Sequence, residues 1–129
     1  MNKTTRAIEE AKALARSFQY EDAFKLLDRL IEESPSDPIV RLCRAYVFDH
    51  KGDPEAAAWE ISQAIVLHDR EPDYFLTRAR YYMMSGRFED ALKDLTTTLT
   101  LCDEHRSDYY REAAHLFRAE CPRAAGQGS

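Results

Sequence analysis

The sequence predicts an all-α fold built from antiparallel helix hairpins, with about seven helices and no sheet. The main observation is a repeat, since GRFEDALKDL at residues 86–95 corresponds to GDPEAAAWEI at 52–61 and to FQYEDAFKLL at 18–27. Apolar residues also recur at helical spacing, and Gly and Pro fall where helices should begin and end. Because the three segments are 34 residues apart, we expect one packing arrangement to be used three times.

The first unit, residues 4–37, has the pattern that the other two units follow. Ala11 in its first helix is followed by the larger Leu14, and Ala23 in its second helix is followed by Leu27. Small residues let paired helices approach closely, and large residues fill the space between them. The equivalent positions of the three units are Ala11, Ala45 and Ala79; Leu14, Phe48 and Tyr82; Ala23, Ala57 and Ala91; Leu27, Ile61 and Leu95; and Ile31, Ile65 and Leu99.

The second unit, 38–71, and the third unit, 72–105, both begin at a proline. Asp-Pro at 37–38 and at 53–54 places an N-cap acceptor before a proline at the first helical position, where its missing N–H costs nothing. Glu-Pro at 71–72 is a weaker version of the same signal. These dipeptides therefore predict the starts of three helices.

A single helix over 107–120 is expected after the third unit. SDYYREAAHLFRAEC aligns with PDYFLTRARYYMMSG of the third unit at a shift of 35 residues, which pairs Ala79 with Ala114. We interpret this helix as a cap, and a fourth unit truncated after its first helix is the alternative. Residues 1–121 are then expected to form a single domain, and the small and polar residues 122–129 a disordered tail.

This pattern resembles the tetratricopeptide repeat (TPR) family, whose unit is a 34-residue helix–turn–helix. The turn glycine of the family is present as Gly52 and Gly86 and is replaced by Phe18 in the first unit. The sequence departs from the family pattern at two other signature positions. The proline that closes each repeat is present only as Pro35, and the position that is tryptophan in the family is occupied by Ala7, Arg41 and Phe75 in the three units. The resemblance implies a TPR-type α-solenoid in which the first helices line a concave groove.

Composition and motifs argue against several classes of function. The net charge of −5 and the lack of a long apolar window make nucleic acid and membranes poor partners, and we expect a cytoplasmic protein. No phosphate-binding loop, zinc-protease motif or nucleophile elbow occurs, and the four histidines lack metal-ligand spacing. We therefore expect no enzyme activity, no catalytic residue, no metal and no cofactor. The irregular spacing of Cys43, Cys102 and Cys121 predicts free thiols.

Two arginines recur with the repeat, and each has an acid at a fixed distance. Arg44 and Arg78 occupy equivalent positions, and Glu60 and Asp94 lie sixteen residues after them. The TPR resemblance implies an Arg in the first helix that faces an acid in the second. Since the acid recurs with the arginine, we interpret these residues as ion pairs within each hairpin rather than as ligand contacts.

The resemblance also implies which residues line the groove. That face is basic with apolar and aromatic residues, on a protein that is acidic overall, and an ordinary solvated face is the alternative. The predicted partner-binding residues are Lys12, Arg16, Tyr46, His50, Arg80, Met84, Arg111 and His115. The clamp with which some TPR domains hold the C-terminal carboxylates of heat-shock chaperones is not matched, because Lys12 lies where that clamp has Asn and Asp73 where it has Lys.

Trp59, the one tryptophan of the chain, is a further candidate for partner binding. Its equivalents in the other units are Lys25 and Lys93, so the position should tolerate full exposure. Tryptophan is enriched in binding hot spots because it removes much apolar area from water with few rotamers to freeze. Packing across a neighbouring helix is the alternative reading.

These observations predict a non-enzymatic protein-protein interaction module that binds a protein or an acidic peptide through its concave groove. Small TPR proteins of this kind resemble immunity proteins that neutralise a bacterial toxin and chaperones of secreted proteins. The alternative is a structural TPR scaffold that associates with itself through the open end of its last helix. The chain is accordingly expected to be a monomer or a weak homo-oligomer.

Overall fold

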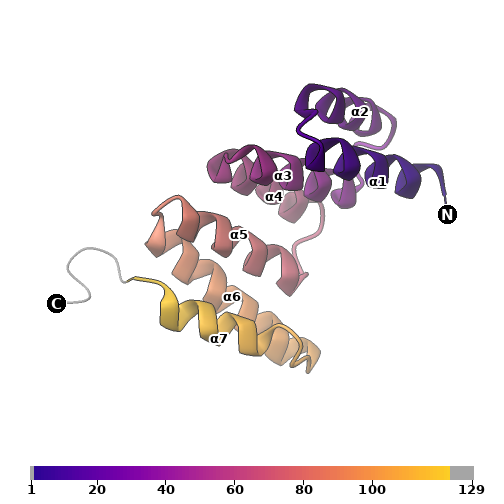
Figure 1. Ribbon diagram of the computed structural model, residues 1–129. Helices are drawn as coiled ribbons and strands as arrows, with labels where there is room; N and C mark the ends of the chain where they lie inside the picture. The colour runs from indigo at the N-terminus through magenta and orange to yellow at the C-terminus, as the bar shows by residue number, and fades with distance from the viewer. Residues whose placement is uncertain (1, 123–129) are drawn as a thin grey trace. The chain divides into compact units, whose positions relative to one another are not determined.

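The computed structural model describes residues 2–122, and they form helices joined by short turns (Figure 1). Within this range there are seven helices and no strand, which confirms the predicted all-α fold. The helices are α1 (Lys3–Arg16), α2 (Tyr20–Glu33), α3 (Pro38–Lys51), α4 (Pro54–Leu67), α5 (Pro72–Met84), α6 (Phe88–His105) and α7 (Arg111–Glu120).

The chain divides into two compact units, Met1–His68 with α1 to α4 and Asp69–Ser129 with α5 to α7. The expectation that residues 1–121 form a single domain stays a prediction. Residues 123–129 of the predicted disordered tail lie outside the described residues.

The helices of the second and third repeats begin where the Asp-Pro and Glu-Pro dipeptides predict. The side chains of Asp37 and Asp53 accept hydrogen bonds from the backbone N–H groups of Ile39 and Ala56, at 2.9 and 3.1 Å. Glu71, before α5, makes no such side-chain bond, as the weaker signal suggests. In all three cases a proline occupies the first turn, where it removes no helical hydrogen bond.

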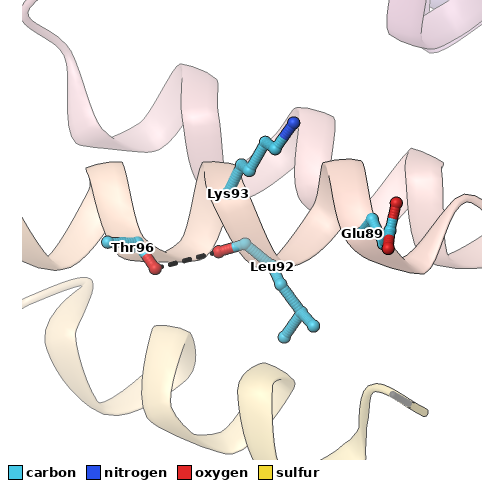
Figure 2. A pocket seen from close by; sticks show the side chains of 4 residues that line it. All are labelled: Glu89, Leu92, Lys93 and Thr96. Carbon is cyan, nitrogen blue, oxygen red and sulfur yellow. Dashed lines mark hydrogen bonds between the residues drawn. The ribbon is translucent and has the colours of Figure 1, made fainter. Parts of the chain in front are cut away.

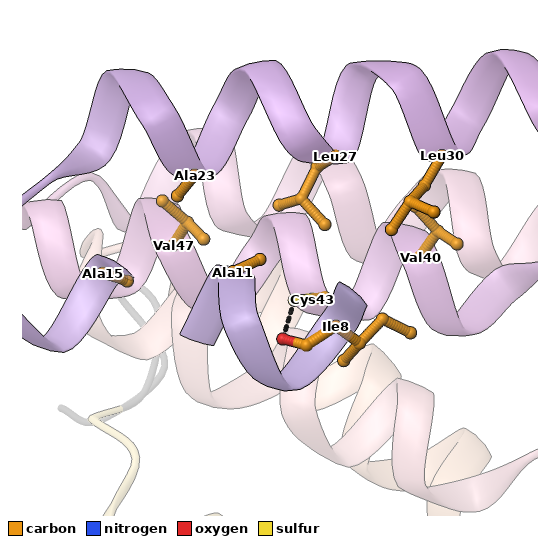
Figure 3. Close-up of a cluster of buried hydrophobic side chains, with 9 residues drawn as sticks. All are labelled: Ile8, Ala11, Ala15, Ala23, Leu27, Leu30, Val40, Cys43 and Val47. Carbon is orange, nitrogen blue, oxygen red and sulfur yellow. Dashed lines mark hydrogen bonds between the residues drawn. The ribbon is translucent and has the colours of Figure 1, made fainter. Parts of the chain in front are cut away.

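The core of the N-terminal unit lies where α1, α2 and α3 meet (Figure 3). Ala11 and Ala23 are fully buried at the predicted close-approach positions, and Leu27 and Val47 fill the space beside them. The Cys43 thiol on α3 lies 3.8 Å from the backbone carbonyl oxygen of Ile8 on α1. Helix α3 packs against both α1 and α2, so α1 and α3 are neighbours in this unit.

The C-terminal unit repeats this hairpin and adds α7. Ala79 on α5 and Ala91 on α6 are fully buried, and Ala114 of α7 belongs to the same core. The cap helix was predicted over 107–120, but α7 begins only at Arg111. The difference arises because α6 ends in a left-handed residue, Arg106, with φ of 53°, and the chain needs a turn before it can form the next helix.

The turn between the helices of each hairpin uses a left-handed backbone. Gly52 and Gly86 have φ of 86° and 76°, a region that glycine enters without steric cost. Phe18, at the equivalent place in the first repeat, also has a positive φ, of 63°. Phe18 therefore replaces the turn glycine of the other repeats while the left-handed backbone conformation of the turn is retained.

The predicted ion pairs form, and in the second repeat the pair is part of a network. Arg78 binds Asp94 through two hydrogen bonds of 2.7 and 2.8 Å. Arg44 lies 3.6 Å from Glu60 but 2.9 Å from Asp28 of α2, while Arg41 takes the other oxygen of Glu60 at 3.1 Å. The sequence predicted a pair between α3 and α4 of the second hairpin. The structure shows that pair within a network of four charged residues, which also links α3 to α2.

Candidate functional site

Three of the predicted groove residues, Lys12, Arg16 and His50, gather around the side chain of a fourth, Tyr46. The side chain of Arg16 donates a long hydrogen bond to this oxygen at 3.4 Å, and Nε2 of His50 lies 3.1 Å from it. The Lys12 ammonium lies 5.7 Å from the centroid of the Tyr46 ring, within the range of a cation–π interaction. We call Lys12, Arg16, Tyr46 and His50 the Tyr46 cluster.

Helical spacing and helix packing together build the Tyr46 cluster. Lys12 and Arg16 are four residues apart on α1, as are Tyr46 and His50 on α3, so each pair shares one helix face. The rings of Tyr46 and His50 lie 4.7 Å apart between their centroids. In addition, the Tyr20 hydroxyl donates to the backbone carbonyl of His50 at 3.1 Å, which holds the end of α3 in place.

The Tyr46 cluster carries more positive than negative charge. Glu9 lies 3.9 Å from the Lys12 ammonium, on an exposed side chain where such a pair contributes little. Arg16 is exposed, and its guanidinium contacts the hydroxyl of Tyr46. With Arg16 donating to the Tyr46 oxygen, the phenol proton is available to His50 or to a bound group. The cluster can therefore bind an anionic oxygen against an aromatic surface.

The remaining predicted groove residues lie on α5 and α7 of the C-terminal unit. Arg80 is exposed, with its guanidinium 5.3 Å from the centroid of the Tyr81 ring, and Met84 is exposed at the end of α5. On α7, Nδ1 of His115 lies 3.2 Å from the Arg118 guanidinium.

Arg111 differs from the other basic residues because two acids hold it. Its guanidinium forms ion pairs with Asp103, at the end of α6, and with Asp108, in the turn before α7. Hydrogen bonds to both carboxylates raise the pKa of Arg111. Its charge is largely offset locally, which makes it the weakest of the predicted anion-binding residues. The repeat pattern selected Arg111 as a groove residue but did not predict its ion pairs with Asp103 and Asp108.

Comparisons with known proteins agree with the repeat architecture. No protein-family model matches the chain. Over 68 residues, 53% of the chain, it is 38% identical to Hsp70-Hsp90 organizing protein 1 of Glycine max, but the match spans only 12% of that protein's length.

Three solved structures are similar over nearly the whole chain. The type III secretion chaperone SycD of Yersinia enterocolitica, in complex with a peptide of the translocator YopD, has a TM-score of 0.77 at 18% identity, covering 94% of this chain and 93% of SycD. The TPR2B domain of yeast Sti1 in its pHsp70 complex has a TM-score of 0.73 at 16% identity, over 90% and 96% of the two chains. The second TPR domain of human RPAP3, with an HSP70 peptide, has a TM-score of 0.73 at 19% identity, over 92% and 93%.

The chain has the tetratricopeptide repeat fold. In this TPR fold, three equivalent second helices, α2, α4 and α6, can be compared position by position. Trp59 on α4 is 57% exposed, as expected from the lysines at the equivalent positions, Lys25 and Lys93. Val66, two turns further along α4, is also exposed, so this helix alone of the three presents an apolar outer stripe at these positions.

Two pockets of the TPR units were not anticipated from the sequence. One lies along α6 and is lined by Glu89, Leu92, Lys93 and Thr96, with the Thr96 hydroxyl bonded back to the Leu92 carbonyl (Figure 2). The other lies at the turn between α1 and α2 and is lined by Phe18, Gln19, Tyr20, Glu21, Asp22 and Lys51. The replacement of the turn glycine by Phe18 is the sequence signal that could have pointed to the second pocket.

Residues 2–122 contain no group of three or more His, Cys, Asp or Glu side chains placed to hold a metal ion. The same residues include no helix with both the length and the apolar character needed to cross a membrane.

Proposed function

We propose that this chain is a non-enzymatic TPR module that binds an acidic segment of another protein, with the Tyr46 cluster as the anchor for one of its carboxylates. The observation that carries the proposal is that Arg16 and His50 meet at the Tyr46 hydroxyl while the Lys12 ammonium lies over the ring of the same tyrosine. Structures with the same fold include complexes with peptides of a translocator, Hsp70 and Hsp90, which supports a peptide as the ligand.

The chemistry of the Tyr46 cluster suits a carboxylate. Lys12 and Arg16 supply positive charge, and charge-assisted hydrogen bonds are about twice as strong as neutral ones. The Tyr46 hydroxyl can donate a further hydrogen bond, while its ring offers an apolar wall to the methylene groups of a Glu or Asp side chain. Arg80, Met84, Arg111 and His115 are proposed as further contacts for a longer segment, with Arg111 the least important because of its acidic partners.

Among the finer roles, we favour a chaperone of a secreted protein over an immunity protein or a heat-shock co-chaperone. SycD bound to a translocator peptide is similar over 94% of this chain, which supports the first role. A terminal carboxylate of a heat-shock protein is disfavoured because Asp73 stands where the clamp has a lysine. Asp73 is held by the Thr77 hydroxyl at 3.3 Å, and burial raises the pKa of its carboxyl group.

Binding of a synthetic acidic peptide, measured by fluorescence anisotropy, tests the proposal. Lys12→Glu combined with Arg16→Glu should abolish binding, since the charge of the Tyr46 cluster is reversed. Lys25→Glu combined with Arg29→Glu is a matched control, because these two residues have the same spacing on the exposed side of α2. Equal loss of binding in both variants would show that only the total charge matters, and would rule out the Tyr46 cluster as the site.

A further inference from the structure

Phe18 takes a backbone conformation that its side chain makes unfavourable. The equivalent turn residues of the other repeats are glycines, and each has open space where a Cβ atom would be added. Steric crowding is therefore not what selects glycine at this position; the positive φ is. Phe18 adopts the same region with φ of 63°, where a bulky residue is a rare outlier.

The fold does not offset this cost by burying the ring. Phe18 is 76% exposed, so its large apolar side chain remains mostly in water. Glycine would satisfy the turn without strain, as Gly52 and Gly86 do. A strained and exposed aromatic residue contributes little to folding, and strained residues of this kind cluster at functional sites.

Phe18 forms one wall of the pocket between the α1–α2 turn and the end of α3. The ring of Tyr20 meets the ring of Phe18 edge to face, with 6.4 Å between centroids. Lys51, the last residue of α3, lies with its ammonium 6.0 Å from the centroid of the Phe24 ring. We call the pocket lined by Phe18, Gln19, Tyr20, Glu21, Asp22 and Lys51 the Phe18 pocket.

The Phe18 pocket adjoins the Tyr46 cluster within the N-terminal unit. Tyr20 of the pocket donates its hydroxyl to the backbone carbonyl of His50, which belongs to the cluster, at 3.1 Å. Lys51 of the pocket directly follows His50 on α3. A peptide segment whose carboxylate lies at the Tyr46 cluster would therefore pass close to the Phe18 pocket.

We propose that the Phe18 pocket binds an apolar side chain of the same acidic segment, which makes the recognised motif a carboxylate with a neighbouring apolar residue. The inference rests on the proposed function. Glu21 and Asp22 in the pocket disfavour a second acidic side chain by like-charge repulsion, whereas the exposed ring of Phe18 and the half-buried ring of Tyr20 favour apolar contact. The Phe18 pocket would then decide which acidic segments are bound.

Two labelled peptides separate this inference from the proposed function. The first contains a short run of Asp and Glu between two serines, and the second has leucines in place of the serines. We expect the leucine peptide to bind roughly 3- to 10-fold more tightly, as expected for partial burial of one leucine. If neither peptide binds, the proposed function and this inference both fail. If both bind equally, only the inference is overturned.

Phe18→Gly provides the matched variant. It should remove the preference for the leucine peptide and leave the affinity for the serine peptide unchanged. It should also raise the melting temperature, because glycine relieves the strain at positive φ. Val66→Ser removes a comparably exposed apolar side chain from the same unit and should leave the preference intact.

Sedimentation of the wild type and of Phe18→Gly tests whether a second copy of the chain, rather than a peptide, occupies the Phe18 pocket. A concentration-dependent dimer that only the wild type forms would assign the Phe18 pocket to a second copy of the chain, and would overturn the inference.

Changes in backbone amide chemical shifts on peptide binding show where the leucine lies. Shifts at Gln19 and Lys51 that appear with the leucine peptide alone are the expected result, and their absence contradicts it.

Discussion

Arg78 on α5 holds both carboxylate oxygens of Asp94 on α6, at 2.7 and 2.8 Å, and so links the two helices of the third hairpin. Both side chains are largely withdrawn from water, with 19% of the arginine and 5% of the aspartate side chain exposed. Burial raises the pKa of the Asp94 carboxyl group, although Arg78 acts in the opposite direction. The carboxylate therefore depends on Arg78 to remain charged inside the unit.

Replacing Arg78 by Met should destabilise the protein by about 3–5 kcal/mol, because it leaves Asp94 buried without its partner. Arg78→Met combined with Asp94→Leu removes both charges and should recover most of the loss. Chemical denaturation of the two variants measures the difference. A double variant that is no more stable than Arg78→Met would contradict this account of the pair.

Ala45→Leu should destabilise the protein by roughly 1–3 kcal/mol, since it overfills a position where two helices approach closely. Ala45 is 1% exposed, and its equivalents Ala11 and Ala79 are fully buried. Lys93→Leu, at an exposed place on α6, should be nearly neutral and serves as the control. Thermal denaturation followed by circular dichroism tests both, and equal effects would argue against close packing at Ala45.

The stability of the protein should fall in alkaline solution because of Cys43. Burial raises the pKa of its thiol from 9.0 to about 11. Below the unfolded pKa both states hold the proton, but between these values only the unfolded chain releases it, so the free energy of unfolding falls as the pH rises. Two pKa units correspond to about 2–3 kcal/mol.

Denaturation of the wild type and of Cys43→Ala between pH 8 and pH 11 measures this contribution. The variant should show a shallower fall, and what remains includes the contributions of Cys102, Cys121 and Tyr110, whose pKa values burial also raises. Identical pH dependence in the two proteins would mean that Cys43 ionises without constraint in the folded state.

Trp59 should fluoresce with a red-shifted maximum that iodide quenches, because 57% of the residue is exposed. If it anchors a partner, Trp59→Ala should weaken binding by at least ~2 kcal/mol with little change in stability. Trp59→Lys is a sharper variant, since lysine occupies the equivalent positions 25 and 93. Partner binding that survives both changes would remove Trp59 from the interface.

Reversal of Lys12 and Arg80 to Glu should weaken binding of an acidic partner mainly through a slower association rate. Association of the wild type should also slow as salt increases, because screening acts over about 8–10 Å at moderate ionic strength. Stopped-flow kinetics at several salt concentrations tests both statements. Helical content and melting temperature should stay close to those of the wild type, since both residues lie outside the buried core.

The sequence by itself determined the helices, the repeat register and the residues that pack between helices. A 34-residue period repeats the same local geometry, so Ala11, Ala45 and Ala79 are buried and Trp59 is exposed at positions that the register already specifies. Helix starts followed from Asp-Pro dipeptides because capping and proline geometry act within a few residues of the chain.

Only the tertiary structure decided which side chains meet where the repeats differ from one another. The repeat pattern pairs Arg44 with Glu60, and this pair forms, but the structure adds Arg41 to Glu60 and Asp28 to Arg44. Likewise, the packing of α3 on α1 was needed to bring Arg16 and His50 to one hydroxyl group. Such contacts depend on side-chain rotamers and on residues far apart in the chain. The 34-residue repeat could not predict them, because it shows only the features that successive repeats share.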